Sequence, residues 1–265
     1  MRNLFTRLLA RNRSFLIACA LLLGGFQFIL CAIVRSMNLE SALEQLLTFA
    51  PPIFRSMIEQ SVLGGSTAGV LAFGWNHPIT HAVMTAVAIT LAARAIAGEI
   101  ETGAIELVLT QPLSRKTYLA CHVIFGVTAI TIVACAGALG TVIGQRVFEL
   151  KPFEAQRVAG LLLNMILLQS AIYAITLLVS AWGREAGRVA VIGVLAVVTS
   201  YLTNAIATLW PQAAFLHAYS LHNYYDPRSI LVKGDLSASS ALVLAGSAVV
   251  CAVVAFRRFG ARDLP

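Results

Sequence analysis

The sequence predicts an all-α membrane protein in which six helices cross the bilayer. Its 265 residues are 58% hydrophobic and only 12% charged, whereas soluble domains usually carry about a quarter charged residues. A helical crossing needs about 20 mostly apolar residues, and uncharged runs of that length recur along the chain. Little sequence remains between these runs. We therefore expect a single transmembrane domain over residues 1–265, with no separate soluble domain.

The chain begins with a basic, amphipathic segment over residues 1–13. Apolar side chains lie on one helical face and arginines on another, the apolar ones being Leu4, Phe5, Leu8 and Leu9. This pattern is typical of a helix in the headgroup layer, and the alternative is a frayed basic tail that only fixes topology. The apolar run 14–34 follows without a convincing signal cleavage site, so we expect a retained first crossing.

Five further apolar runs complete the predicted bundle. They cover residues 78–97, 117–144, 158–182, 189–210 and 237–256. The run 117–144 ends with Gly140 and Gly144, a small-xxx-small spacing that lets helices approach closely. Between the first two crossings, leucines at helical spacing predict short interfacial helices, namely Leu39, Leu43, Leu46 and Leu47.

The basic residues predict which side each loop faces. With both termini in the cytoplasm, twelve of the 19 basic residues lie on the inside, and the others are spread over longer outer loops. The positive-inside rule favours this orientation, with cytoplasmic N and C termini. The net charge of +7 therefore reflects topology and does not predict a nucleic-acid partner.

The sequence carries no motif of a catalytic centre. It lacks the phosphate loop G-x-x-x-x-G-K-[ST], the elbow G-x-S-x-G and the zinc motif H-E-x-x-H. The five cysteines form no CxxC pair and are expected to pack as small apolar residues. His77 and His81 have a ligand-compatible spacing, but no nearby carboxylate completes a metal set. We predict no catalytic residue, no metal site and no cofactor in this chain.

A narrow polar stripe follows one face of the run 158–182. Four residues spaced at i, i+4, i+7 and i+11 form it, namely Gln169, Tyr173, Thr176 and Ser180. Polar groups in hydrocarbon seek partners, so the stripe should face protein or a wet cavity. Two interpretations stay open: hydrogen bonding between helices, and the lining of a substrate path.

One segment interrupts the apolar pattern, RAIAGEIETGAIELVLTQPLSR at residues 94–115. Glu99, Thr102 and Glu106 fall on one helical face, which predicts a short amphipathic helix lying across the membrane surface with its carboxylates in the cytoplasm. Pro112 ends it, and Ser114 can cap the next helix. The alternative is a solvated loop whose charges only keep it out of lipid.

This segment resembles the region between the second and third helices of ABC type-2 transporter permeases. The matching residues are Arg94-x-x-x-Gly98-Glu99-x-Glu101-x-Gly103, Glu106-Leu107 and Pro112-x-Ser114-Arg115-x-x-Tyr118-Leu119. The basic amphipathic start agrees with the resemblance, as do Tyr225-Asp226-Pro227 before the last crossing and the ending Arg262 to Pro265.

The resemblance implies a function and its partners. Residues 98–113 would be a coupling helix that docks on a separate ABC ATPase subunit through Glu99, Glu101, Thr102, Gly103 and Glu106. That subunit would bind ATP and Mg²⁺, and the chain, itself no enzyme, would form a permease homodimer among the lipids of the cell inner or plasma membrane. The expected activity is outward movement of a lipidic, amphipathic or natural-product molecule by alternating access.

Two other functions are compatible with the sequence. The same architecture could relay ATPase motion to a partner outside the cytoplasm instead of moving a substrate. A membrane-embedded enzyme acting on lipid would need a nucleophile or a metal set within the bundle, for which His77, His81 and scattered serines are the only candidates.

Overall fold

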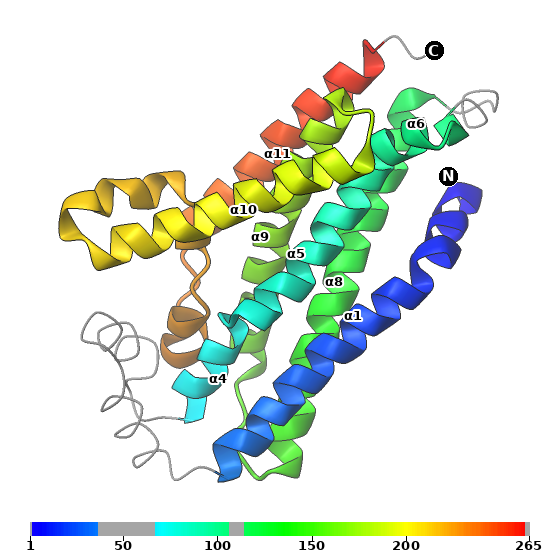
Figure 1. Cartoon of the computed structure of the whole chain (residues 1–265). Coiled ribbons are helices and arrows are strands. Elements are labelled where there is room, and N and C mark those ends of the chain that lie inside the picture. Colours follow the sequence, from blue (N-terminus) through cyan, green and yellow to red (C-terminus); the bar gives the residue numbers. More distant parts are fainter. Residues whose placement is uncertain (1, 37–66, 106–113, 263–265) are drawn as a thin grey trace.

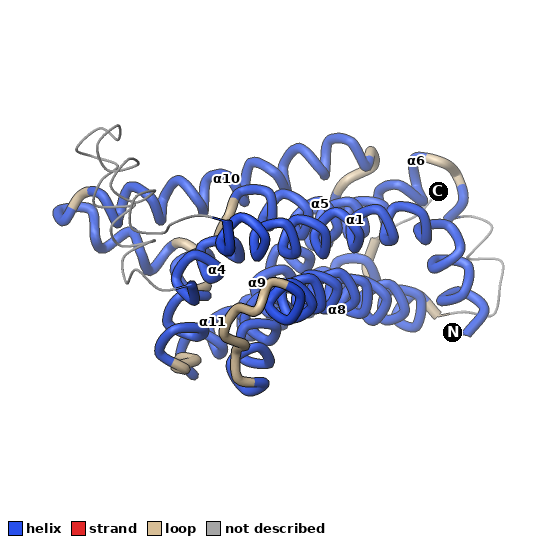
Figure 2. Tube along the Cα trace, turned by 90° about the horizontal axis from the view of Figure 1, so that it is seen from below, coloured by secondary structure: helices blue, strands red, loops and turns tan. Residues whose placement is uncertain are grey.

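We analysed a computed structural model of the chain, which describes residues 2–36, 67–105 and 114–262. Within these ranges the chain forms helices joined by turns, without a strand (Figure 2). Six helical stretches are long and apolar enough to cross a membrane, at residues 4–36, 67–101, 115–147, 155–182, 186–209 and 238–260. The predicted all-α fold with six crossings is confirmed. The interfacial helices predicted from Leu39 to Leu47 lie outside the described residues.

Figure 1 shows the order of the helices along the bundle. The first four crossings are formed by α1 (Arg2–Ser36), by α4 (Thr67–Trp75) together with α5 (Pro78–Ala93), by α8 (Arg115–Val147) and by α9 (Ala155–Trp182). The last two are α10 (Ala186–Leu209) and α11 (Ala238–Gly260). Between α10 and α11 the chain forms the short helices η2 (Pro211–Tyr219), η3 (Leu221–Tyr224) and η4 (Ser229–Lys233).

Two boundaries differ from the sequence-based expectation. The predicted interfacial segment 1–13 and the first crossing 14–34 are parts of one continuous helix, α1. The second crossing begins earlier than residue 78, because α4 precedes α5 and the two are separated by a short break. Pro78 explains the break: a residue before proline avoids the helical region, and His77 has φ −70° and ψ 143°. The His77 ring then caps α5 by accepting the Ile79 N–H.

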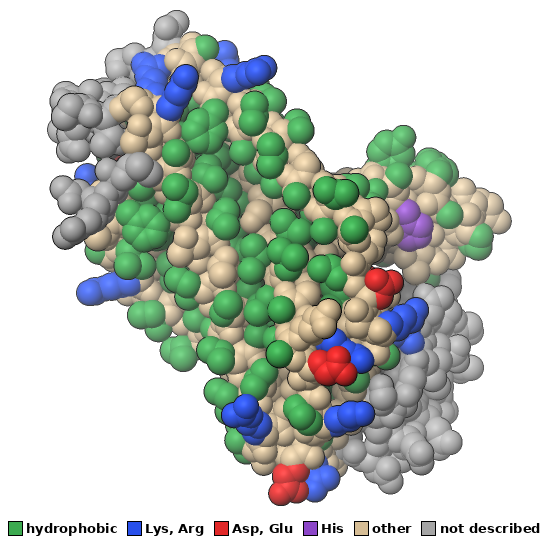
Figure 3. All heavy atoms as spheres, turned by 180° about the vertical axis from the view of Figure 1, so that it is seen from behind, with side chains coloured by type: hydrophobic (Ala, Val, Ile, Leu, Met, Phe, Trp, Pro, Cys, Tyr) green, Lys and Arg blue, Asp and Glu red, His purple; other side chains and the backbone are tan. Residues whose placement is uncertain are grey.

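The second crossing is the most buried of the six, with 72% of its apolar window inside the protein, and α5 supplies most of its length. In α10 and α11 the corresponding share is only 11%. Figure 1 shows α10 crossing the other helices obliquely, and Figure 3 shows a broad hydrophobic surface between ends that carry Lys and Arg side chains. An apolar outer surface between two charged ends is the expected form of a membrane-embedded bundle.

Close contact between α1 and α8 depends on glycine. A β-carbon on Gly140 would collide with the carbonyl oxygen of Gly24, and one on Gly144 would lie 2.7 Å from the Cys31 β-carbon. Both glycines of the predicted small-xxx-small spacing therefore face α1, which confirms their close-packing role.

We expect Gly140→Ala to lower the free energy of unfolding by about 1–3 kcal/mol, because the two backbones must separate to admit the methyl group. The thermal unfolding midpoint of the detergent-solubilised protein measures this effect. Gly25→Ala is the matched control, since a β-carbon there meets no atom within 4 Å. Equal midpoints for the two variants would contradict the close packing.

The two chain termini lie at one end of the bundle, together with the segment that follows α5 (Figure 1). We call this the terminal end. Arg115 donates to the carbonyl oxygen of Arg262, and Arg262 donates to the carbonyls of Ala181 and Gly183, both at 2.9 Å. These bonds attach the C-terminal residues to α8 and α9. Towards the opposite end, which we call the loop end, lie η3 and η4, whereas η2 folds back along α10 and projects from the side of the bundle (Figure 1).

Candidate functional site

The segment after α5 continues as helix rather than as a loop. A π-helical turn, η1 (Arg94–Gly98), is followed by the short helix α6 (Glu99–Glu101), which ends at Thr102 and Gly103. Gly103 has φ +69°, a left-handed conformation that favours glycine at helix ends. Of the predicted coupling segment 98–113, residues 98–105 are described, and Glu106 lies outside the described residues. We call residues 94–105 the coupling segment from here on.

Glu99 is buried, which the sequence did not predict. Only 5% of the residue is exposed, and its carboxylate forms an ion pair with Arg11 of α1. The expectation that this carboxylate faces the cytoplasm is therefore wrong. The reason is tertiary, because the basic start of α1 lies beside α6 and supplies the opposite charge (Figure 1). Glu99 holds two helices together at the terminal end.

Glu101 connects the coupling segment to α10. The residue is exposed, and its Oε2 atom accepts the backbone N–H of Ala186 at 2.8 Å. Ala186 begins α10, whose own N-cap residue, Glu185, makes no side-chain cap. A carboxylate bound at a helix N-terminus interacts favourably with both the free N–H group and the helix dipole. Glu101 therefore caps α10 from a distant part of the chain.

The π-helical turn and Ala93, the residue before it, make three further bonds to neighbouring helices. The Tyr118 hydroxyl of α8 donates to the Ala95 carbonyl at 2.8 Å. The Ser180 hydroxyl of α9 donates to the Ala93 carbonyl at 3.1 Å and accepts the Ala97 N–H at 3.0 Å. Together with Glu99 and Glu101, these bonds join the coupling segment to α1, α8, α9 and α10. A displacement of the segment would act on four helices at once.

The polar stripe of α9 is buried throughout, with at most 2% of each of its four residues exposed. Ser180 accepts the Ala97 N–H of the coupling segment, and Tyr173 donates to the His122 carbonyl of α8 at 2.9 Å. Thr176 bonds within its own helix, and Gln169 contacts the Met165 sulfur. Tyr173 and Ser180 thus make helix-to-helix hydrogen bonds. That the stripe lines a substrate path stays a prediction. It is supported by Thr176, which borders a small cavity beside Gly193.

A larger site that the sequence did not predict lies between α5 and α10. It is a groove of about 560 Å³, which we call the lateral groove, lined by the apolar side chains of Ala82, Ala86, Ile89, Val194, Val198 and Leu202. No Asp, Glu, Lys or Arg is among its described lining residues. Its volume lies within the range of about 300–1,000 Å³ that is typical of ligand sites.

The less buried Thr90 and Tyr201 line the lateral groove, which is also lined by three more deeply buried polar side chains from α5 and η3, namely His81, Thr85 and His222. Each is at least nine-tenths buried, with exposed fractions of 7%, 9% and 5%. The imidazole rings of His81 and His222 are 5.4 Å apart between centroids. Burial lowers the pKa of His222 to about 4, so its ring is neutral near pH 7.

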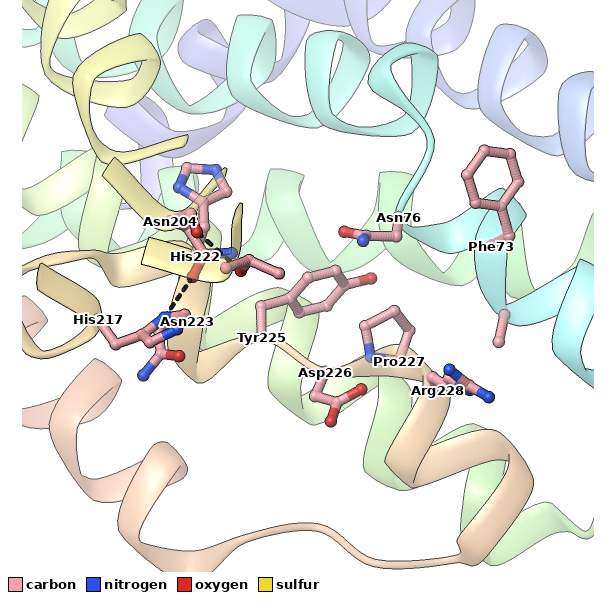
Figure 4. Close-up of a pocket in the computed structure, with 12 residues that line it drawn as sticks. Phe73, Asn76, Asn204, His217, His222, Asn223, Tyr225, Asp226, Pro227 and Arg228 are labelled. Carbon is pink, nitrogen blue, oxygen red and sulfur yellow. Dashed lines mark hydrogen bonds between the residues drawn. The ribbon is translucent and has the colours of Figure 1, made fainter. Parts of the chain in front are cut away.

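The loop end holds a second, polar cavity of about 460 Å³ (Figure 4). Amide, imidazole and carboxylate groups line it, from Asn76, Asn204, His217, Asn223 and Asp226. The Tyr225-Asp226-Pro227 element forms one wall. Its Tyr225 hydroxyl donates to the Trp75 carbonyl at 3.1 Å, which ties this element to α4. His222 lines both the polar cavity and the lateral groove.

Comparison with known families identifies the chain. A family model described as ABC-2 family transporter protein matches residues 8–264. The chain belongs to this family. No curated protein matches the sequence. The chain is therefore a membrane permease of an ABC transporter, a multi-pass protein of the plasma membrane. Membership implies that it pairs with an ABC ATPase subunit, and such permeases are transport subunits, not catalytic domains.

In this permease, the sequence predicted a candidate site after the second crossing but not the lateral groove. Glu101, Thr102 and Gly103 remain exposed at the terminal end, whereas Glu99 does not. His77 caps α5, and His81 contacts the Asn76 side chain. The signal for the lateral groove was present in His81 and Thr85, two polar residues one helical turn apart within a crossing.

Proposed function

We propose that this permease serves an ATP-driven exporter that moves a lipidic, amphipathic or natural-product molecule outward by alternating access. The bonding of the coupling segment carries the proposal. Its described tip is exposed at one end of the bundle, and its buried side is joined to α1, α8, α9 and α10. A surface that is free outside and bonded to four helices inside is suited to transmit force.

The proposed docking surface consists of Glu101, Thr102 and Gly103, with Glu106 as a further predicted contact. Glu99 takes a different role in this proposal, because its buried carboxylate holds the segment against α1. The ATPase subunit binds ATP and Mg²⁺ and docks from the cytoplasm. The terminal end would then be cytoplasmic, which agrees with the distribution of basic residues along the sequence.

A second copy of the permease completes the proposed transporter. The apolar outer faces of α1, α10 and α11 support this proposal, since at most 22% of each apolar window is buried within one chain. Closure of two ATPases would move the two coupling segments together. Through the bonds described above, this motion would tilt the attached helices and alternate the side from which the substrate is reached.

The ATP hydrolysis of an ATPase that copurifies with the permease tests this proposal. We expect the affinity-tagged permease, extracted in mild detergent from cells that express its own ATPase, to carry vanadate-sensitive MgATP hydrolysis. Thr102→Arg should lower this activity at least tenfold, because it places a bulky cation on the docking surface. The matched control is Thr208→Arg: both threonines are exposed and donate to the carbonyl four residues earlier, but Thr208 belongs to the polar cavity.

Two results would contradict the proposal. Undiminished ATP hydrolysis in Thr102→Arg would show that the ATPase docks elsewhere. In proteoliposomes, ATP hydrolysis that no lipidic or amphipathic compound stimulates, together with an outer protein bound at a fixed ratio, would favour the mechanical relay over export.

A further inference from the structure

The lateral groove contains three buried polar atoms that have no hydrogen-bond partner among the described residues. They are His81 Nδ1, Thr85 Oγ1 and His222 Nε2. A buried polar group without a partner costs about 1–3 kcal/mol, so such groups usually have a protein, water or ligand partner. All three belong to residues that line the same groove. Apart from Thr90 and Tyr201 the rest of the lining is apolar, so three unpartnered polar atoms in one part of its wall indicate a ligand with one polar end.

In each imidazole ring, the hydrogen bond made by one nitrogen bears on whether the unpartnered nitrogen donates or accepts. His81 Nε2 lies 3.1 Å from the Asn76 amide oxygen, which can only accept, so Nε2 carries the proton and Nδ1 is an acceptor. His222 Nδ1 lies 2.9 Å from the Ser200 hydroxyl. The Ser200 hydroxyl accepts the Leu221 N–H and also lies 3.3 Å from the Ser220 hydroxyl, so it can either donate to Nδ1 or accept from it, and His222 Nε2 is correspondingly a donor or an acceptor.

The lateral groove thus offers an acceptor at His81, together with a ring nitrogen at His222 and a hydroxyl at Thr85 that can each donate or accept. A ligand group that both donates and accepts matches this set, as in an alcohol, a monoglyceride or a primary amide. A charged headgroup does not fit, because the described lining holds no opposite charge that would offset its desolvation.

We propose that the lateral groove binds an uncharged amphiphile, whose hydroxyl or amide head meets His81, Thr85 and His222 and whose apolar chain lies between α5 and α10. This deepens the proposed function by naming the chemical class of the substrate and where the permease takes it from the bilayer. His222 is shared with the polar cavity at the loop end. The head of the amphiphile therefore lies next to the polar cavity, with the His222 side chain between them.

A long-chain monoacylglycerol is a suitable probe, because its uncharged head carries hydroxyl groups and it has one apolar chain. We expect native mass spectrometry of the purified permease to show saturable binding of one monooleoylglycerol per chain. Oleate, which has the same chain and a charged head, should bind at least tenfold more weakly. Thr85→Val keeps the side-chain shape and removes the hydroxyl, so it should weaken monooleoylglycerol binding about tenfold.

A second pair of variants separates the chain-binding surface from the general apolar exterior. Ala86 is exposed in the lateral groove, and Ala86→Trp should abolish saturable binding by filling it. Leu195→Trp is the control on α10, since Leu195 is 59% exposed and lines none of the described cavities. Equal thermal unfolding midpoints exclude misfolding as the cause of a lost signal.

The inference fails if oleate or phosphatidylcholine binds as tightly as monooleoylglycerol, or if Thr85→Val and Ala86→Trp bind like the parent. Because the measurement uses the permease without its ATPase, it is independent of ATP coupling. Saturable binding combined with absent ATP hydrolysis would overturn the proposed function alone, whereas coupled hydrolysis without binding would overturn the lateral site alone.

Discussion

Glu99→Lys is expected to yield little folded permease, whereas the exchange Arg11→Glu with Glu99→Lys restores it. The Glu99 side chain is 7% exposed, so a lysine there places an unpaired cation beside Arg11 in a buried position. Breaking a buried ion pair by changing one partner costs about 3–5 kcal/mol, and the Arg11 side chain, 42% exposed, places this pair near the lower value. Such a loss is a large fraction of the stability of most proteins.

Fluorescence-detected size-exclusion chromatography of a fused reporter measures the folded fraction, and the thermal midpoint measures its stability. Arg13→Glu is the control for charge reversal at the start of α1, because Arg13 is exposed. Wild-type yield and midpoint in Glu99→Lys would show that the pair does not hold α1 to the coupling segment. Failure of the double variant to regain either would assign Glu99 a role other than pairing with Arg11.

Glu101→Ala is expected to loosen the first turn of α10 without unfolding the permease. The carboxylate accepts the Ala186 N–H, and its loss removes a charge-assisted bond at a helix N-terminus. If that bond contributes about 1.4 kcal/mol, amide hydrogen exchange over residues 186–189 should accelerate about tenfold. Hydrogen–deuterium exchange with mass spectrometry resolves this peptide.

Glu185→Ala is a stringent comparison for that measurement. Glu185 directly precedes α10, yet its side chain makes no cap and pairs instead with Arg188. Exchange at residues 186–189 should therefore change less in Glu185→Ala than in Glu101→Ala. The reverse order would show that the coupling segment does not hold α10.

Much of the fold could be predicted, because the crossings are set by hydropathy over about 20 consecutive residues. The runs 158–182 and 189–210 match α9 and α10 to within a few residues. The second crossing was harder, since Pro78 marks a helix start and conceals α4 before it. The close approach of α1 and α8 could be predicted from Gly140 and Gly144, but the partner helix could not.

The site was predictable only in part, because its chemistry depends on pairs far apart in the sequence. Helical periodicity placed Glu99 on the same face as Thr102, but it could not show that Arg11 covers the carboxylate. The lateral groove exists only because α10 lies beside α5, and no local pattern encodes that pairing. His81 and Thr85 were visible as polar residues in a crossing, whereas His222 joins them through η3.

The central claim is that ATP-driven motion of the coupling segment reaches the lateral groove through Glu101. Pulsed electron–electron double resonance can report the width of the groove from spin labels at Ala82→Cys of α5 and Val198→Cys of α10. The partly exposed Cys19, Cys135 and Cys251 are changed to alanine in this variant. In the complex with the ATPase, we predict that ATP with vanadate shifts the label distance, and that Glu101→Ala removes the shift while ATP binding persists. An unchanged distance in the parent, or an undiminished shift in Glu101→Ala, would contradict the account.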